Sequence, residues 1–277
     1  MQWVMFSKHL APYAVPEMGK VVRGLGFDGV DLTVRPGGHV LPEQVREALP
    51  AAVAALREEG LSVPMITTGV VDAEEPHAGA IFATAAACGI TRLKLGYWSY
   101  PRFGTMAALI EECRRKMDGI EALAKRHGVR ACIHIHSGNT VSANAAVVAR
   151  LLEGRDPQAA GAYIDPGHMT AEGSVSGWRQ GIDLLSPYLS LVAVKAFGWE
   201  KSTDPATGDV VWNTRMVPLR EGAVRWREVF AILRQLGYDG PVSFHSEYQG
   251  SHSWRDLTVE ELIAQTRDDF AYIRGLL

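Results

Sequence analysis

Apolar residues recur along the chain in two alternating patterns, one with the spacing of an amphipathic helix and one in short continuous runs. Runs of about four to eight Val, Ile and Leu residues indicate strands buried on both faces, as in a parallel sheet. Several runs follow a glycine that closes a helical pattern, where glycine supplies the left-handed C-cap. The predicted strands lie within residues 2–7, 24–34, 58–68, 87–97, 126–136, 161–167, 189–197 and 235–245.

The spacing of the helix-closing glycines predicts repeated strand–helix units. Gly26, Gly60, Gly89 and Gly128 are separated by 34, 29 and 39 residues, which is the length of one such unit. The 109 residues from Gly128 to Gly237 leave room for the sixth and seventh strands and their helices. Helical patterns are clearest at residues 42–60, 104–127, 226–237 and 259–277.

Eight alternations of strand and helix, with no linker rich in Pro, Gly or Ser, predict an α/β protein of one domain. The expected fold is a (β/α)8 TIM barrel that spans residues 1–277. The alternative is an open, doubly wound sheet, which would carry a glycine-rich phosphate-binding turn after its first strand. Residues 7–16 read SKHLAPYAVP and contain no glycine, so the barrel is favoured.

Composition and charge narrow the class of protein. Of the 277 residues, 47% are hydrophobic and 21% are charged, which is typical of a folded globular protein and excludes a disordered chain. The formal net charge of -3 argues against a nucleic-acid partner. No run approaches the roughly 20 apolar residues of a membrane span, and residues 1–16 lack the pattern of a signal peptide, so we expect a cytoplasmic protein with no membrane partner. Cys88, Cys113 and Cys132 form no CxxC pair, which indicates reduced thiols.

Polar residues stand late in the predicted strands, at the end of a TIM barrel where active sites lie. Four histidines and two carboxylates close strands 5, 6 and 8, whereas buried polar groups in an ordinary core are few and paired. Each residue alone has a structural explanation, such as an ion pair between Lys195 and Asp165, but the whole set predicts a functional pocket. Its members are Asp31, Arg35, Lys94, Tyr97, Trp98, His134, His136, Asp165, His168, Lys195, His245 and Glu247.

Imidazole and carboxylate groups in this arrangement predict one divalent transition metal per chain. We expect His134, Asp165 and His245 to be its ligands. Such ligands suit Mn, Zn, Co, Fe or Ni. The open coordination positions would let the ion polarise a carbonyl or a hydroxyl group of a substrate.

Proton transfer at the carbon next to that group needs further side chains. Glu247 provides a second carboxylate, and His136, His168 or Lys195 provides a base whose pKa the surroundings can adjust. We therefore predict that these four residues are catalytic.

Substrate contacts are expected from strand 2, strand 4 and one long loop. Asp31 and Arg35 would reach the substrate, or would only hold the barrel rim together, and Trp98 would stack on a sugar or only pack. The segment at residues 198–222 is long for a strand-to-helix connection. We expect it to be a lid or a subunit contact that places Trp199, Trp212 or Arg215 over the pocket, and the alternative is a surface β-hairpin.

Several segments resemble the xylose isomerase-like TIM barrels, the sugar isomerase and epimerase superfamily that also includes endonuclease IV. The resemblance covers essentially the whole chain. It is carried by GFDGVDL (26–32), IHIHSGN (133–139), YIDPGH (163–168), LVAVK (191–195), VPLREGAVRW (217–226) and GYDGPVSFHSEY (237–248). The resemblance implies a carbohydrate isomerase or epimerase that abstracts a proton next to a sugar carbonyl. It also implies a homodimer or homotetramer.

The usual metal ligands of that family are matched only in part. They are a Glu on strand 5, an Asp on strand 6, a His on strand 7 and a Glu on strand 8, and these positions hold His134, Asp165, Ala193 and His245. Three alternatives follow. The site binds a metal through His134, Asp165 and His245, or it uses histidines as bases without a metal, or the barrel binds carbohydrate without catalysis.

Other reactions at the same site stay open. A lyase that acts by β-elimination on a keto-sugar or glycoside would share the first proton abstraction. An endonuclease would need more carboxylate ligands and a basic track, so it is disfavoured. No phosphate-binding loop is present, which favours a neutral sugar or a sugar acid, although Arg35 would be able to hold a phosphate.

Overall fold

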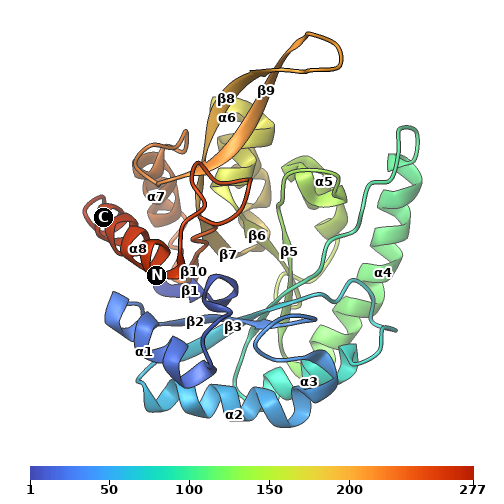
Figure 1. The fold of residues 1–277 in the computed structure, drawn as a ribbon. Coiled ribbons are helices and arrows are strands. Elements are labelled where there is room, and N and C mark those ends of the chain that lie inside the picture. The colour runs from blue at the N-terminus through green and yellow to red at the C-terminus, as the bar shows by residue number, and fades with distance from the viewer.

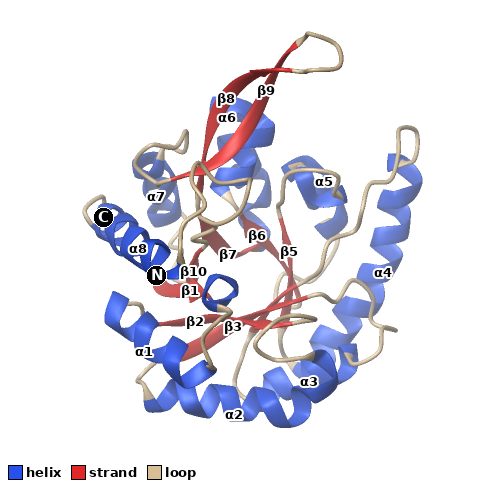
Figure 2. Ribbon diagram, in the orientation of Figure 1, coloured by secondary structure: helices blue, strands red, loops and turns tan.

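The computed structural model describes residues 1–277 and contains a closed barrel of eight parallel strands (Figures 1 and 2). Their order around the barrel is β1-β10-β7-β6-β5-β4-β3-β2. The strands are β1 (Gln2–Phe6), β2 (Gly29–Val34), β3 (Ser62–Thr68), β4 (Arg92–Lys94), β5 (Arg130–His134), β6 (Ala160–Ile164), β7 (Leu189–Val194) and β10 (Pro241–Phe244). Seven of them fall inside the predicted runs, β6 begins one residue before its run, and the TIM barrel is confirmed.

Helices surround the barrel on its outside (Figure 1). They are α1 (Val15–Leu25), α2 (Val45–Glu58), α3 (Ala78–Ala87), α4 (Met106–His127), α5 (Ala145–Leu152), α6 (Pro166–Leu185), α7 (Trp226–Gln235) and α8 (Val259–Arg274). Short 3-10 turns cover Ser7–Leu10, Pro42–Gln44, Val141–Ala143 and Ser186–Tyr188. None of the helices combines the length and the apolar character that crossing a membrane requires.

A small apolar cluster fills the barrel interior, separate from the large core between strands and helices. Its members are Val4, Met65, Cys132, Tyr163, Leu191 and Ala193. Successive side chains of a strand point to opposite faces, so the residue two positions later points inward again. For four of these positions the next inward residue is polar: Thr67, His134, Asp165 and Lys195. The period of the strands therefore stacks a polar layer directly on this apolar plug.

The long segment after β7 folds into an antiparallel hairpin of β8 (Ala196–Thr203) and β9 (Val210–Val217). The hairpin projects beyond the helices at the top of Figure 1. Trp199 and Trp212 are 47% and 62% exposed on it. The segment therefore forms the surface β-hairpin that was given as the alternative in the sequence analysis. A role as a lid or a subunit contact stays a prediction.

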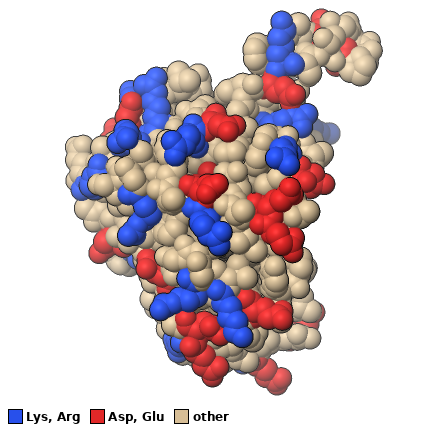
Figure 3. Space-filling view, turned by 60° about the vertical axis from the view of Figure 1, so that its left-hand side comes forward, with Lys and Arg blue, Asp and Glu red and all other residues tan.

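Lys and Arg side chains are interspersed with Asp and Glu on the face in Figure 3, with no broad basic area. Cys88, Cys113 and Cys132 are all free.

Candidate active site

A cavity of about 80 Å³ opens at the C-terminal end of the barrel strands. Its lining comes from the ends of all eight barrel strands and from the segments that follow them. The residues are Phe6, Lys8, Arg35, Thr67, Lys94, Tyr97, His134, His136, Tyr163, Lys195, His245 and Glu247. The structure thus brings together most of the residues that the sequence placed late in the strands.

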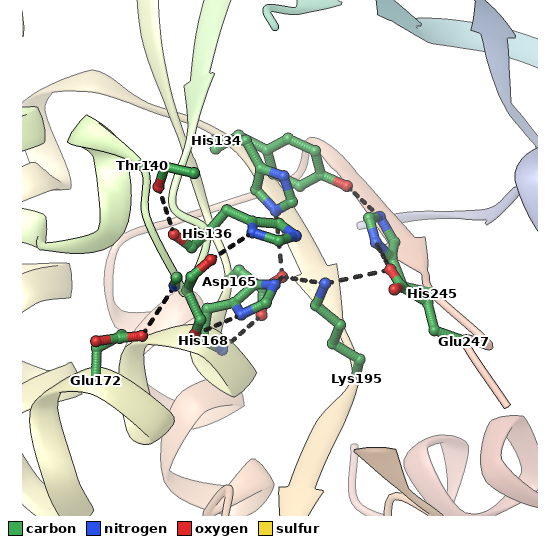
Figure 4. Close-up of polar contacts among 12 residues, drawn as sticks. His134, His136, Thr140, Asp165, His168, Glu172, Lys195, His245 and Glu247 are labelled. Carbon is green, nitrogen blue, oxygen red and sulfur yellow. Dashed lines mark hydrogen bonds and ion pairs between the residues drawn. The ribbon is translucent and has the colours of Figure 1, made fainter. Parts of the chain in front are cut away.

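One ion triad lies at the centre of this cluster (Figure 4). Lys195 Nζ is 3.2 Å from Asp165 Oδ2 and 3.3 Å from Glu247 Oε1. Burial opposes a charged amine, but the two carboxylates outweigh burial and raise the pKa of Lys195. Burial likewise opposes both carboxylates, yet Lys195 holds the pKa of Asp165 below, and that of Glu247 well below, its ordinary value. All three groups are therefore charged at neutral pH.

His134 connects this triad to Tyr97. His134 Nε2 is 3.2 Å from Asp165 Oδ2, and Tyr97 Oη is 2.8 Å from His134 Nδ1. Burial lowers the pKa of His134 well below its ordinary value, so the ring is neutral. An ionised carboxylate only accepts, so Nε2–H donates to Asp165 and Nδ1 accepts from the Tyr97 hydroxyl, a tautomer assigned from this network.

His245 occupies the other side of Glu247. Its Nε2 is 2.8 Å from the hydroxyl of Tyr163, and its Nδ1 is 3.4 Å from Glu247 Oε1. Its ring stacks on Phe6 with centroids 4.5 Å apart. Burial lowers the pKa of His245 as well, so this imidazole is also neutral.

His136 and His168 form a second histidine pair, with ring centroids 4.1 Å apart. His136 Nδ1 donates to the Ser137 carbonyl at 2.9 Å, which leaves Nε2 as an acceptor on a ring that lines the cavity. His168 Nδ1 is 2.8 Å from Ser137 Oγ, and its backbone N–H donates to Asp165 Oδ1 at the start of α6. His168 does not line the cavity, so it acts on the site only through these neighbours.

The predicted substrate contacts lie in different places. Arg35 lines the cavity and forms no ion pair with a carboxylate. Asp31 lies deeper, fully buried, and accepts hydrogen bonds from Thr67 and Ser243. Trp98 is buried, and its indole N–H donates to the Val71 carbonyl. Trp199 is on the exposed hairpin and does not line the cavity.

The sequence assigned no role to six of the cavity residues, which are Phe6, Lys8, Thr67, Lys94, Tyr97 and Tyr163. Lys94 and Tyr97 stand late in the predicted strand 4, but nothing in the local pattern assigns them a partner. Tyr163 is two positions before Asp165 and so shares its face, and the strand period alone was a sufficient signal to find it.

The predicted metal ligands do not converge on one point. Within the structure no group of three or more His, Cys, Asp or Glu side chains could hold a metal ion. The Lys195 amine takes the position between the two carboxylates, and His245 Nε2 is directed at a tyrosine hydroxyl. In this arrangement the donor set does not fit a divalent cation.

Comparisons with known proteins agree with this fold. The family profile described as "Xylose isomerase-like TIM barrel" matches residues 20–274. Among solved structures, 3-keto-D-glucoside 4-epimerase from E. coli has a TM-score of 0.69 and 16% identity, and covers 99% of both chains. A D-psicose 3-epimerase solved in the presence of D-fructose has a TM-score of 0.68 and 18% identity, and covers 100% of this chain and 99% of its own.

A third similar structure contains a metal. It is a xylose isomerase-like TIM barrel protein from Mycobacterium smegmatis in complex with magnesium, with a TM-score of 0.69, 16% identity and coverage of 99% of this chain and 96% of its own. At these identities the likeness shows the fold alone. No curated protein is significantly similar to the chain in sequence.

Proposed function

The chain belongs to the xylose isomerase-like TIM barrel family, and we propose that it is a carbohydrate isomerase or epimerase that moves a proton at the carbon next to a sugar carbonyl. One observation carries the proposal: an ionised carboxylate, Glu247, and a charged amine, Lys195, share one cavity at the C-terminal end of the barrel. A base and a positive charge side by side are the two requirements for forming an enediolate.

Glu247 is the base of the proposed reaction. Its side chain is 14% exposed to the cavity, and one oxygen is held by Lys195 while the other faces Lys8 at 3.9 Å. The carboxylate would take the proton from the carbon beside the carbonyl, and the Lys195 ammonium would stabilise the negative charge that develops on the substrate oxygen.

His136 is the second proton carrier. It comes from β5, three strands from β10 around the barrel, and the lone pair of its Nε2 is free. His136 would first take up a solvent proton on Nε2, and that proton, delivered from this direction, would reach a different face or a different carbon of the intermediate. Isomerisation, epimerisation and β-elimination all begin with the same abstraction, so the product identifies which of them occurs.

The similar structures named as epimerases support this proposal. One is named for a 3-keto-D-glucoside and the other for D-psicose. Both names describe carbonyl sugars, which is the class of substrate that the charge pair Lys195–Glu247 would handle.

Deuterium wash-in tests the proposal. The protein would be incubated in D2O with a panel of ketoses, and exchange at the carbons beside the carbonyl followed by NMR. We expect wash-in by the wild type and a loss of roughly 10²-fold or more in Glu247→Gln, because a positioned general base contributes about that much. Glu58→Gln, on the exposed end of α2, is the matched control and should exchange at the wild-type rate. Sugar-dependent stabilisation without any wash-in would contradict the proposal and indicate a binding protein.

A further inference from the structure

A second lysine, Lys94, faces the same cavity without a counter-ion. It is the last residue of β4, is 3% exposed, and its Nζ lies 3.6 Å from the centroid of the Tyr97 ring. The Nζ atom forms no hydrogen bond and no ion pair, whereas Lys195 pairs with both Asp165 and Glu247. An aromatic face is a weak partner for a fully charged ammonium that is removed from water.

The surroundings of Lys94 favour the neutral amine. Burial lowers its pKa well below the ordinary value, and the positive charges of Arg35 and Lys195 act in the same direction. Asp31 and Glu247 oppose the shift but do not cancel it. A neutral amine has a free electron pair on nitrogen, and here that nitrogen borders a cavity.

The position of this amine is fixed by the barrel wall. Lys94 pairs in register with Thr67 of β3 and with Cys132 of β5. Its carbonyl accepts a hydrogen bond from the Thr68 hydroxyl at 2.8 Å. Because the backbone is held on both sides and the stem is packed, the Nζ atom stays between the Tyr97 ring and the cavity.

We propose that Lys94 Nζ is a nucleophile that forms a Schiff base with the carbonyl carbon of the substrate. The inference rests on the proposed function in one respect, that the substrate carries a carbonyl. In this step the C=O double bond of the carbonyl is broken and a C=N double bond to Lys94 Nζ forms. One amine and one ketone thus give one imine and one water. The two amine protons leave with the oxygen, and no oxidant or reductant is needed.

An imine would provide the electron-withdrawing group that a metal ion would otherwise supply, and the carboxylates here are not available to bind a metal. Once protonated, it withdraws electrons from the neighbouring carbon and makes that C–H bond acidic. Glu247 would then abstract the proton with the electron pair passing to nitrogen. The Schiff base is thus an electron sink formed by the chain itself, in a site where Lys195 keeps the carboxylates from binding a cation.

The cavity favours a short open-chain substrate. Its volume of about 80 Å³ is small beside the roughly 300–1,000 Å³ of usual ligand pockets. A short ketose presents a free carbonyl, whereas larger sugars close into rings that mask it. The smallest ketose, dihydroxyacetone, is therefore the probe of choice.

Reductive trapping tests the inference. The protein would be incubated with dihydroxyacetone and borohydride, digested, and the labelled lysine located by mass spectrometry. At pH 7.5 we expect Lys94 to be labelled about tenfold or more above surface lysines, since one unit of pKa changes the fraction of neutral amine about tenfold. Lys94→Arg should abolish this label, and Lys20→Arg, on the exposed face of α1, should leave it unchanged.

Deuterium wash-in in the same samples separates this inference from the proposed function. Wash-in without a label at Lys94, or labelling of Lys94 no faster than of surface lysines, would overturn the Schiff base and leave the proposed function standing. A label at Lys94 without wash-in would support the nucleophile and contradict the proposed reaction. If neither a label at Lys94 nor wash-in is detected, the Schiff base and the proposed function are both contradicted. The labelled lysine is located in the wild-type protein. The test therefore gives an answer even if Lys94→Arg does not fold.

Discussion

At the scale of single residues, two lysines that face one cavity differ in charge because their neighbours differ. Lys195 has two carboxylates within 3.3 Å and is an ammonium. Lys94 has an aromatic ring and like charges nearby, and burial and these charges hold its pKa well below the ordinary value. Neither lysine can replace the other, since one organises the carboxylates and the other is free to react.

Buried histidines make the stability of the protein depend on pH. Burial lowers the pKa of His9 to about 3, and its Nε2 atom has no hydrogen-bond partner. In the unfolded chain the pKa would return to about 6.5. The unfolded state therefore takes up a proton as pH falls below about 6.5 while the folded state does not. Stability is fully present above about pH 6.5 and is lost progressively toward pH 3.

We predict that His9→Gln weakens this pH dependence. Each such histidine contributes about 1.4 kcal/mol per pH unit to the slope of the free energy of unfolding. Urea unfolding measured from pH 6 down to pH 4 should show a slope smaller by about that amount in the variant. His252→Gln, which replaces an exposed imidazole, is the control and should keep the wild-type slope. An unchanged slope in His9→Gln would show that this ring is protonated in the folded state.

At the scale of elements, the short strand β4 and the turn after it place both Lys94 and Tyr97. The turn passes so close to its neighbour that a Cβ at Gly96 would lie 2.3 Å from the Gly69 carbonyl oxygen. Only glycine permits this approach, because the obstructing atom belongs to the backbone and cannot move away like a side-chain end.

We predict that Gly96→Ala destabilises the protein and displaces the site. Overpacking costs about 1–3 kcal/mol, and the shift of the turn should also lower the dihydroxyacetone label at Lys94. Gly24→Ala is the matched control, since that glycine lies in α1 with no atom within 4 Å of the added Cβ. The control should gain about 0.5–1 kcal/mol, because alanine is the better helix former. Chemical denaturation and trapping of both variants would check the prediction, and a Gly96→Ala protein as stable as the wild type would contradict it.

At the scale of the whole molecule, the barrel brings groups from strands far apart in sequence into one charge-balanced cluster. Lys195 from the end of β7 meets Asp165 from β6 and Glu247 from beyond β10. Removing one partner of a buried ion pair costs about 3–5 kcal/mol, so this cluster resists rearrangement. A divalent cation would have to displace the lysine before it could use the carboxylates.

We therefore predict that metal removal leaves the protein unchanged. Dialysis against EDTA should alter neither the melting temperature nor the rate of deuterium wash-in, because the amine already satisfies Asp165 and Glu247. Elemental analysis of the purified protein is the accompanying measurement. About one transition metal per chain, lost in His134→Ala and in His245→Ala, would contradict this prediction and restore the ligand set expected from the sequence.

Local features of the chain were sufficient to predict the fold and the end of the barrel where the candidate site lies. Glycine C-caps and apolar runs are local features, and each strand lies within one residue of its predicted run. The period of two residues also predicts which side chains point inward, and His134, His136, Lys195, His245 and Glu247 do line the cavity.

How deep each polar side chain lies, and which group it pairs with, depend on contacts that form only in the folded barrel. Asp31 lies below the cavity because of its bonds to Thr67 and Ser243, and Trp98 turns away to the Val71 carbonyl. The pairing of Lys195 with two carboxylates, and the isolation of Lys94, depend on the register between strands. The register between strands and the paths of the loops are set by contacts between residues distant in sequence, so a local sequence pattern does not predict them.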